Sequence, residues 1–195
     1  MTEVLLYHHV QGLTEGVRSF ADELRQAGHT VHTPDLFDGR TFGTLEDGMG
    51  FAREAGFGAL AERGVAAADG IRPDVVYAGF SFGVITAQQL AQTREGARGA
   101  LLMYSCLPVS EFGAAWPADV PVQVHGKEGD EFFLEDIDAA RALVESSDLA
   151  ELFLYPGTEH LFADSSLPAF DAPAAALLTE RVLAFLERIP AGESG

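Results

Sequence analysis

The sequence predicts an α/β protein built on one mostly parallel sheet with helices on both faces. Short apolar runs alternate along the whole chain with longer segments that have helical spacing. No internal repeat and no low-complexity linker interrupts this alternation. The chain has 195 residues, which suits one domain, residues 1–195, with a sizeable core.

The first elements follow from local patterns. Val4 to Tyr7 is a fully apolar run, typical of a strand buried on both faces. We expect a helix next, with Thr14 as its N-cap and Gly28 at its end, and then a short strand over residues 29–33.

Residues 44–63 also have a helical pattern, although several glycines weaken it. Each glycine costs a helix about 1 kcal/mol relative to alanine. We therefore expect two helices with a mobile joint, and residues 47–58 are a candidate lid over a pocket.

The rest of the chain continues the alternation. The expected strands cover residues 74–78, 99–104, 121–125 and 151–155, and the expected helices cover residues 82–93, 136–147 and 173–188. The C-terminal residues 191–195 are expected to be frayed.

Composition excludes several classes of partner. The formal net charge is −18, which argues against nucleic acids and anionic membrane surfaces, since both attract basic proteins. Cys106 is the one cysteine, so no internal disulfide can form. No apolar run approaches the ~20 residues that span a bilayer, and the N-terminus lacks a signal-peptide pattern. We expect a cytoplasmic protein, monomeric or homodimeric, that acts on a small molecule.

Polar residues follow the expected strands, and the carboxyl ends of parallel strands meet at one edge of a sheet. Those ends carry His8, His9, Asp35, Ser81, residues 104–106, residues 125–130 and His160. The chemistry is therefore expected at this edge.

The most informative motif is Gly79-Phe80-Ser81-Phe82-Gly83. A serine between two such glycines is typical of a sharp turn from a strand into a helix, which lifts the hydroxyl clear of the sheet. The same turn directs the amide of Phe82 toward negative charge that develops beside the serine. We interpret Ser81 as a nucleophile.

A serine nucleophile needs a base, usually an imidazole, and a carboxylate that orients this imidazole. In the order serine, acid, histidine, the best candidates are Ser81, Asp130 and His160. Glu128 is an alternative acid. We expect His125, which precedes the acid, to pack beneath the loop instead.

An oxyanion hole needs a second backbone donor from the loop after an early strand. Residues 8–12 occupy that place, and we nominate the amide of Val10 together with that of Phe82.

The serine motif, Gly126 to Asp130 and Tyr155 to His160 together resemble the dienelactone hydrolase family of α/β-hydrolases. The resemblance extends over essentially the whole chain and includes Pro34 to Phe37. It implies an eight-stranded α/β-hydrolase fold trimmed at its N-terminus and hydrolysis of an ester or lactone without a metal or other cofactor. It also implies that Ser81, Asp130 and His160 are the nucleophile, acid and base.

Three positions differ from the family pattern. Ser81 stands where dienelactone hydrolases have a cysteine, and His9 appears where they have a glutamate. Asp164 stands where they have an arginine that binds the substrate carboxylate. A dicarboxylate-like lactone would therefore meet a negative charge.

Aromatic residues are numerous in the expected loops, Phe51 and Phe57 among them, and are candidates for the lining of an apolar substrate pocket. Plain core is expected for at least half of these aromatics. The nominated pocket residues are His9, Phe37, Tyr104, Trp116, Phe132 and Leu161. The spacing of His8, His9, His125 and Asp35 matches no metal-ligand motif.

Two other functions use the same residues. The chain could be a non-catalytic, regulatory small-molecule-binding module on this fold, since one fold hosts many functions. It could also be an acyltransferase that passes an acyl group to an acceptor other than water.

Overall fold

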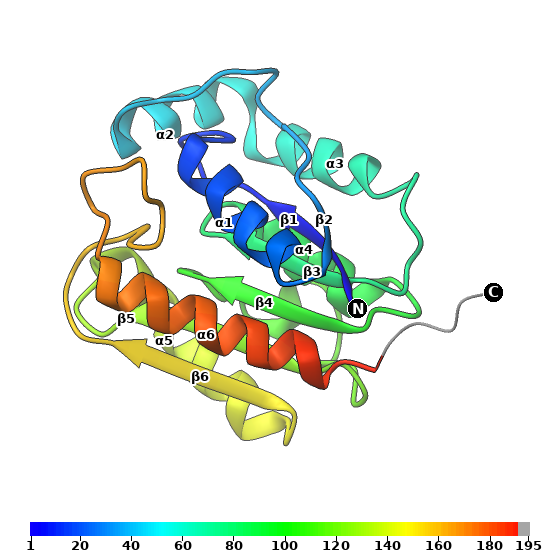
Figure 1. Cartoon of the computed structure of the whole chain (residues 1–195). Helices are drawn as coiled ribbons and strands as arrows, with labels where there is room; N and C mark the ends of the chain where they lie inside the picture. Colours follow the sequence, from blue (N-terminus) through cyan, green and yellow to red (C-terminus); the bar gives the residue numbers. More distant parts are fainter. Residues whose placement is uncertain (191–195) are drawn as a thin grey trace.

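Six parallel strands form one sheet in the order β2-β1-β3-β4-β5-β6 (Figure 1). The computed structural model describes residues 1–190, so the expectation for residues 191–195 lies outside the described residues. The strands are β1 (Glu3–Tyr7), β2 (Thr30–His32), β3 (Val76–Phe80), β4 (Gly99–Met103), β5 (Val122–Lys127) and β6 (Ala150–Tyr155). The predicted parallel α/β architecture is confirmed.

Helices cover both faces of the sheet. The helices are α1 (Glu15–Gln26), α2 (Leu45–Ala55), α3 (Phe57–Ala67), α4 (Gly83–Thr93), α5 (Glu131–Ser146) and α6 (Ala172–Arg188). α1 and α6 pack on one face, and α3, α4 and α5 pack on the other (Figure 1). Within residues 1–190, no helix is long and apolar enough to cross a membrane.

The central strands are buried on both faces, as their continuous apolar sequence predicts. Along β1, Leu5 and Tyr7 enter the core beneath α3 and α4, whereas Val4 and Leu6 enter the core beneath α1 and α6. All four side chains are fully buried. Burial of each such side chain contributes about 1.5–3 kcal/mol.

The chain reverses its direction across the sheet between β1 and β3. It runs outward from β1 to β2 and returns to pair β3 with the other side of β1. In open α/β sheets, ligands bind beyond the carboxyl ends of the strands at such a reversal. The loops that follow β1 and β3, which carry Val10 and Ser81, therefore lie at the expected place for a site.

The helical segment after β2 is divided into α2 and α3, as expected. Gly56 joins the two helices with φ 85°, a left-handed conformation that favours glycine. α2 packs closely on the loop after β1, since a Cβ at Gly48 would lie 2.2 Å from the carbonyl oxygen of Val10. Phe51 also packs edge-on against Phe37, at 4.8 Å between ring centroids. Mobility of this segment stays a prediction.

Several boundaries differ from the sequence-based expectation. α5 begins at Glu131 rather than residue 136, because the carboxylate of Asp130 accepts a hydrogen bond from the amide of Phe132 and caps the helix. β3 and β5 each run two residues further than expected. His125 consequently lies within β5 and not at its end.

His125 is completely buried in the described structure. Its ring lies 2.9 Å from the hydroxyl of Tyr155 and stacks on Phe153. Burial, followed by the charge of Arg181, lowers the pKa of His125 from 6.5 to about 3. Between these two values the unfolded chain binds a proton at this residue and the folded chain does not. The free energy of unfolding therefore falls as the pH falls through this range.

We predict that His125→Gln makes the free energy of unfolding less dependent on pH between about 3 and 6.5. The slope should decrease by up to ~1.4 kcal/mol per pH unit, the value for one proton. Urea unfolding at a series of pH values measures this slope. Phe153→Leu is the control, because it weakens the same packing and removes no titrating group. An unchanged slope in His125→Gln would contradict the prediction.

Candidate active site

Ser81 lies on a tight turn between β3 and α4. Its φ is 50°, a strained value for a residue with a side chain. The turn is held by the amide of Ser81, which donates to the carbonyl of Met103 at 2.7 Å, and by the amide of Val84, which donates to the carbonyl of Ser81 at 2.8 Å.

Both flanking glycines are required by close backbone contacts. A Cβ at Gly79 would lie 2.4 Å from the carbonyl group of Gly83. A Cβ at Gly83 would lie 2.5 Å from the carbonyl oxygen of Tyr7 at the end of β1. The serine turn therefore packs directly against the first strand.

The structure brings together the side chains of Ser81, His160 and Asp130. The hydroxyl of Ser81 lies 2.8 Å from Nε2 of His160, and Nδ1 of His160 lies 2.5 Å from Oδ2 of Asp130. Asp130 is 1% exposed and His160 8% exposed, while Ser81 is half-buried. Glu128 is exposed and makes no such contact among the described residues.

Asp130 has two roles at once. One carboxylate oxygen caps α5 through the amide of Phe132, at 3.1 Å, and the other faces His160. Because both oxygens are engaged, the carboxylate cannot rotate freely, and the position of the His160 ring follows from the start of α5.

The loop that carries His160 is anchored by Lys127, a residue that no sequence pattern marked as part of the site. The side chain of Lys127 is fully buried, and its Nζ lies 2.6 Å from both Glu159 and Asp171, at either end of the loop. A lysine in an apolar strand was the available signal. Its carboxylate partners are 32 and 44 residues away in the sequence, so no local pattern identifies them.

The backbone amides of Val10 and Phe82, the expected oxyanion donors, have no hydrogen-bond acceptor within residues 1–190. Neither the N–H of Val10 nor that of Phe82 donates a hydrogen bond there. The loop around Val10 is nevertheless well fixed, because the amide of Gly12 donates to the carbonyl of His9 and the amide of Phe42 donates to the carbonyl of Gln11. Val10 is 3% exposed and Phe82 6% exposed.

A protein-family model matches nearly the whole sequence. The family model described as "Dienelactone hydrolase family" matches residues 1–189. The chain belongs to the dienelactone hydrolase family.

Solved structures agree with this family in fold. A dienelactone hydrolase from Anabaena variabilis is 20% identical, with 98% of this chain and 88% of that chain covered and a TM-score of 0.69. Pyrobaculum calidifontis esterase is 16% identical, with 96% and 76% covered and a TM-score of 0.69. Thermogutta terrifontis esterase 2, solved as phosphoramylated by tabun, is 15% identical, with 96% and 83% covered and a TM-score of 0.67. No curated protein matches the sequence.

This member of the dienelactone hydrolase family thus has the α/β-hydrolase fold, and its family supports hydrolase activity. Two of its departures from the family pattern contact each other. Nε2 of His9 lies 2.8 Å from Oδ2 of Asp164, and both side chains are buried. Asp164 is 4% exposed, and repulsion of a substrate carboxylate by its charge stays a prediction.

The nominated pocket residues are mostly not at an open surface. Phe132 is 52% exposed, and its ring centroid lies 5.0 Å from that of His160. The other five are buried: His9, Phe37, Tyr104, Trp116 and Leu161. Phe37 and Trp116 belong to the hydrophobic core cluster on one face of the sheet, and a role of these residues in a pocket stays a prediction.

Tyr104 contacts the ring of His160, and Leu161 is the next residue in the same loop. The Tyr104 ring packs edge-on against the imidazole at 5.6 Å, and its hydroxyl accepts a hydrogen bond from the amide of Ala163. Leu161, directly after His160, has φ 58° and shapes the turn of the loop.

Both ring nitrogens of His8 make hydrogen bonds with the protein backbone. Nδ1 donates to the carbonyl of His9 at 2.8 Å, and Nε2 accepts from the amide of Leu36 at 3.0 Å. Burial lowers the pKa of His8 to about 4, so the ring is neutral near pH 7. Within residues 1–190, no group of three or more His, Cys, Asp or Glu side chains could hold a metal ion.

We predict that Gly79→Ala lowers the free energy of unfolding by about 1–3 kcal/mol, because the added methyl group overlaps the backbone of Gly83. Gly50→Ala is the control, since Gly50 is exposed within α2 and nothing lies near its added Cβ. It should raise stability by up to ~1 kcal/mol. Urea unfolding measures both variants. Equal stability of Gly79→Ala and the original chain would show that the turn is not packed as described.

Proposed function

We propose that this chain is a serine hydrolase that cleaves a carboxylic ester or lactone through an acyl-enzyme. The observation that carries the proposal is the continuous series of contacts from Ser81 through His160 to Asp130, at 2.8 and 2.5 Å. A buried carboxylate, an imidazole and a hydroxyl in this order form a system that can ionise the hydroxyl as it attacks.

In the first half-reaction, Oγ of Ser81 attacks the ester carbonyl carbon, and Nε2 of His160 takes the hydroxyl proton. The carbonyl π electrons move onto oxygen, and the N–H groups of Phe82 and Val10 stabilise the resulting oxyanion. When the tetrahedral intermediate collapses, the bond to the alcohol breaks and His160 returns the proton to the leaving oxygen. The acyl group stays on Ser81.

In the second half-reaction, water attacks the acyl-enzyme, with His160 as the base. The intermediate expels Oγ of Ser81, which regains its proton, and the carboxylic acid is released. Throughout, Asp130 accepts a hydrogen bond from Nδ1–H of His160, which fixes the tautomer that leaves Nε2 free to accept a proton.

Exposed aromatic side chains favour an apolar group on the substrate. Phe132 is 52% exposed beside His160, and Phe57 is 37% exposed, with its ring centroid 5.9 Å from that of Phe82 next to the nucleophile. Large exposed aromatics at a site often mark where ligand surface is buried. We therefore propose esters or lactones with a small apolar or aromatic group.

We predict that Ser81→Ala lowers kcat for a small aryl ester by at least ~10³-fold, because no hydroxyl remains to form the acyl-enzyme. Ser105→Ala is the matched control. Ser105 follows the neighbouring strand and donates to Asp136 and not to Asp130 or His160, so its loss should leave kcat unchanged. Steady-state hydrolysis with both purified variants provides the measurement. Unchanged turnover in Ser81→Ala would refute the proposal.

We also predict that Asp130→Asn lowers kcat by about 10²–10⁴-fold, because asparagine cannot stabilise the imidazolium of His160. Asparagine keeps an oxygen that can cap α5, so the fold should persist. Glu128→Gln should retain full turnover because Glu128 is exposed. If Glu128→Gln is the inactive variant and Asp130→Asn is not, the assignment of the acid is wrong.

A further inference from the structure

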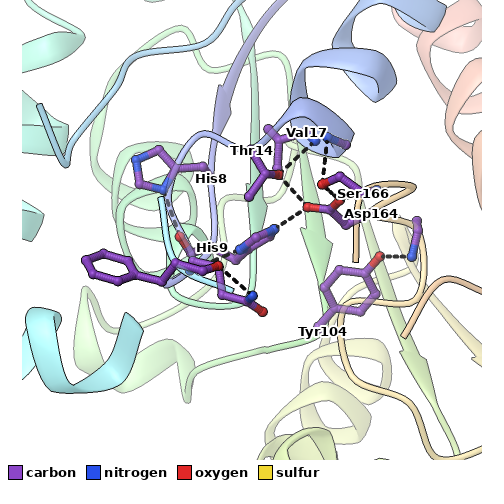
Figure 2. A network of polar contacts seen from close by, with 11 residues as sticks. His8, His9, Thr14, Val17, Tyr104, Asp164 and Ser166 are labelled. Carbon is purple, nitrogen blue, oxygen red and sulfur yellow. Dashed lines mark hydrogen bonds and ion pairs between the residues drawn. The ribbon is translucent and has the colours of Figure 1, made fainter. Parts of the chain in front are cut away.

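Asp164 is the centre of a buried polar network beside the proposed active site (Figure 2). Its Oδ2 accepts hydrogen bonds from Nε2 of His9 at 2.8 Å and from the hydroxyl of Thr14 at 2.5 Å. Its Oδ1 accepts from the hydroxyl and the amide of Ser166, at 2.6 and 2.9 Å. The proposed reaction uses none of these four side chains.

The histidine end of this network is joined to the loop after β1. Nδ1 of His9 accepts a hydrogen bond from the amide of Gln11 at 3.2 Å, and the carbonyl of His9 accepts from the amide of Gly12 at 3.0 Å. Through these two contacts, the ring and the carbonyl of His9 hold the backbone that follows Val10. One neutral tautomer satisfies both contacts, with the proton on Nε2 directed at Asp164 and the lone pair on Nδ1 directed at Gln11.

The carboxylate end is joined to the loop that carries His160. Asp164 lies four residues after His160, and its amide donates to the carbonyl of Leu161 at 3.0 Å. Ser166 connects the same loop to the start of α1, since its hydroxyl accepts from the amide of Gly16 at 3.1 Å. The packing here is tight, because a Cβ at Gly16 would lie 1.7 Å from Oδ1 of Asp164.

Asp164 keeps its charge in this buried place. Burial raises the pKa of the carboxyl, but the hydrogen bonds from His9, Ser166 and Thr14 lower it by more than burial raises it. The pKa of Asp164 therefore lies below its usual value. A buried polar pair of this kind is often no more stabilising than apolar side chains of similar size. Stability alone is therefore a weak explanation for a polar pair between these two loops.

We propose that His9 and Asp164 are positioning residues for ester hydrolysis. Their contact joins the loop that presents the Val10 amide to the loop that presents His160, and it fixes the oxyanion donor relative to the base. This inference rests on the proposed serine hydrolase function. The pair does not touch the substrate: it acts on the transition state through Val10 and His160, and so on kcat more than on KM.

The test uses His9→Asn, Asp164→Ala and the double variant in the full chain. The number of competent sites is first titrated with a fluorophosphonate, and kcat and KM for a small aryl ester are then expressed per titrated site. We expect each single variant to lose about 10–10²-fold in kcat, the effect of a small displacement of catalytic groups, with KM changed less than about threefold. The double variant should be no worse than the poorer single variant, since both single variants remove the contact between His9 and Asp164.

His32→Asn is the matched control. His32 forms a similar histidine–carboxylate pair, 2.7 Å from Glu3, but this pair joins β1 to β2 and touches neither loop. Its kcat per site should equal that of the original chain.

Two results would overturn the inference. If the His9 and Asp164 variants lose thermal stability but retain full kcat per titrated site, the pair is only structural. If KM rises and kcat does not fall, the pair contacts the substrate. Failure of the proposed function is a separate result, because the original chain itself would then show no serine-dependent turnover.

Discussion

The site depends on the close backbone contact between the serine turn and the end of β1. Gly79 and Gly83 let the turn approach so closely that a single added carbon at either position would overlap main-chain atoms. This contact places Ser81 and the amide of Phe82 beside the loop that carries Val10. It also requires that the chain reverse direction between β1 and β3, since only neighbouring strands can bring these two loops together.

The loop that carries His160 has no regular structure of its own and is held by polar contacts. Lys127 binds both ends of the loop through Glu159 and Asp171, and Asp164 ties its middle to the loop after β1. Asp130 is fixed independently, as the cap of α5. Each part of the proposed catalytic apparatus is therefore held by a different element, and these polar contacts set how the elements meet.

The sequence predicted the sheet, most of its elements and the three central side chains, because these depend on local patterns and chain order. Ser81 is marked by its two glycines, and His160 by a loop after the last strand. The contact of His9 with Asp164 was not predictable, since the residues are 155 positions apart and each alone looked like a departure from the family. Core was expected for at least half of the loop aromatics, but which of them are buried, as Phe37 and Trp116 are, depends on tertiary packing. The early start of α5 could not be predicted either, because it depends on the carboxylate of Asp130, which caps the helix and faces His160 at the same time.

The central claim is that His160 and Asp130 make the hydroxyl of Ser81 nucleophilic, and intact-mass measurement after treatment with a fluorophosphonate tests it most directly. The account predicts rapid formation of a single adduct, localised to Ser81 by peptide mapping, and a large loss of labelling rate in His160→Gln. An unlabelled protein, or labelling that is equally fast without His160, would contradict it.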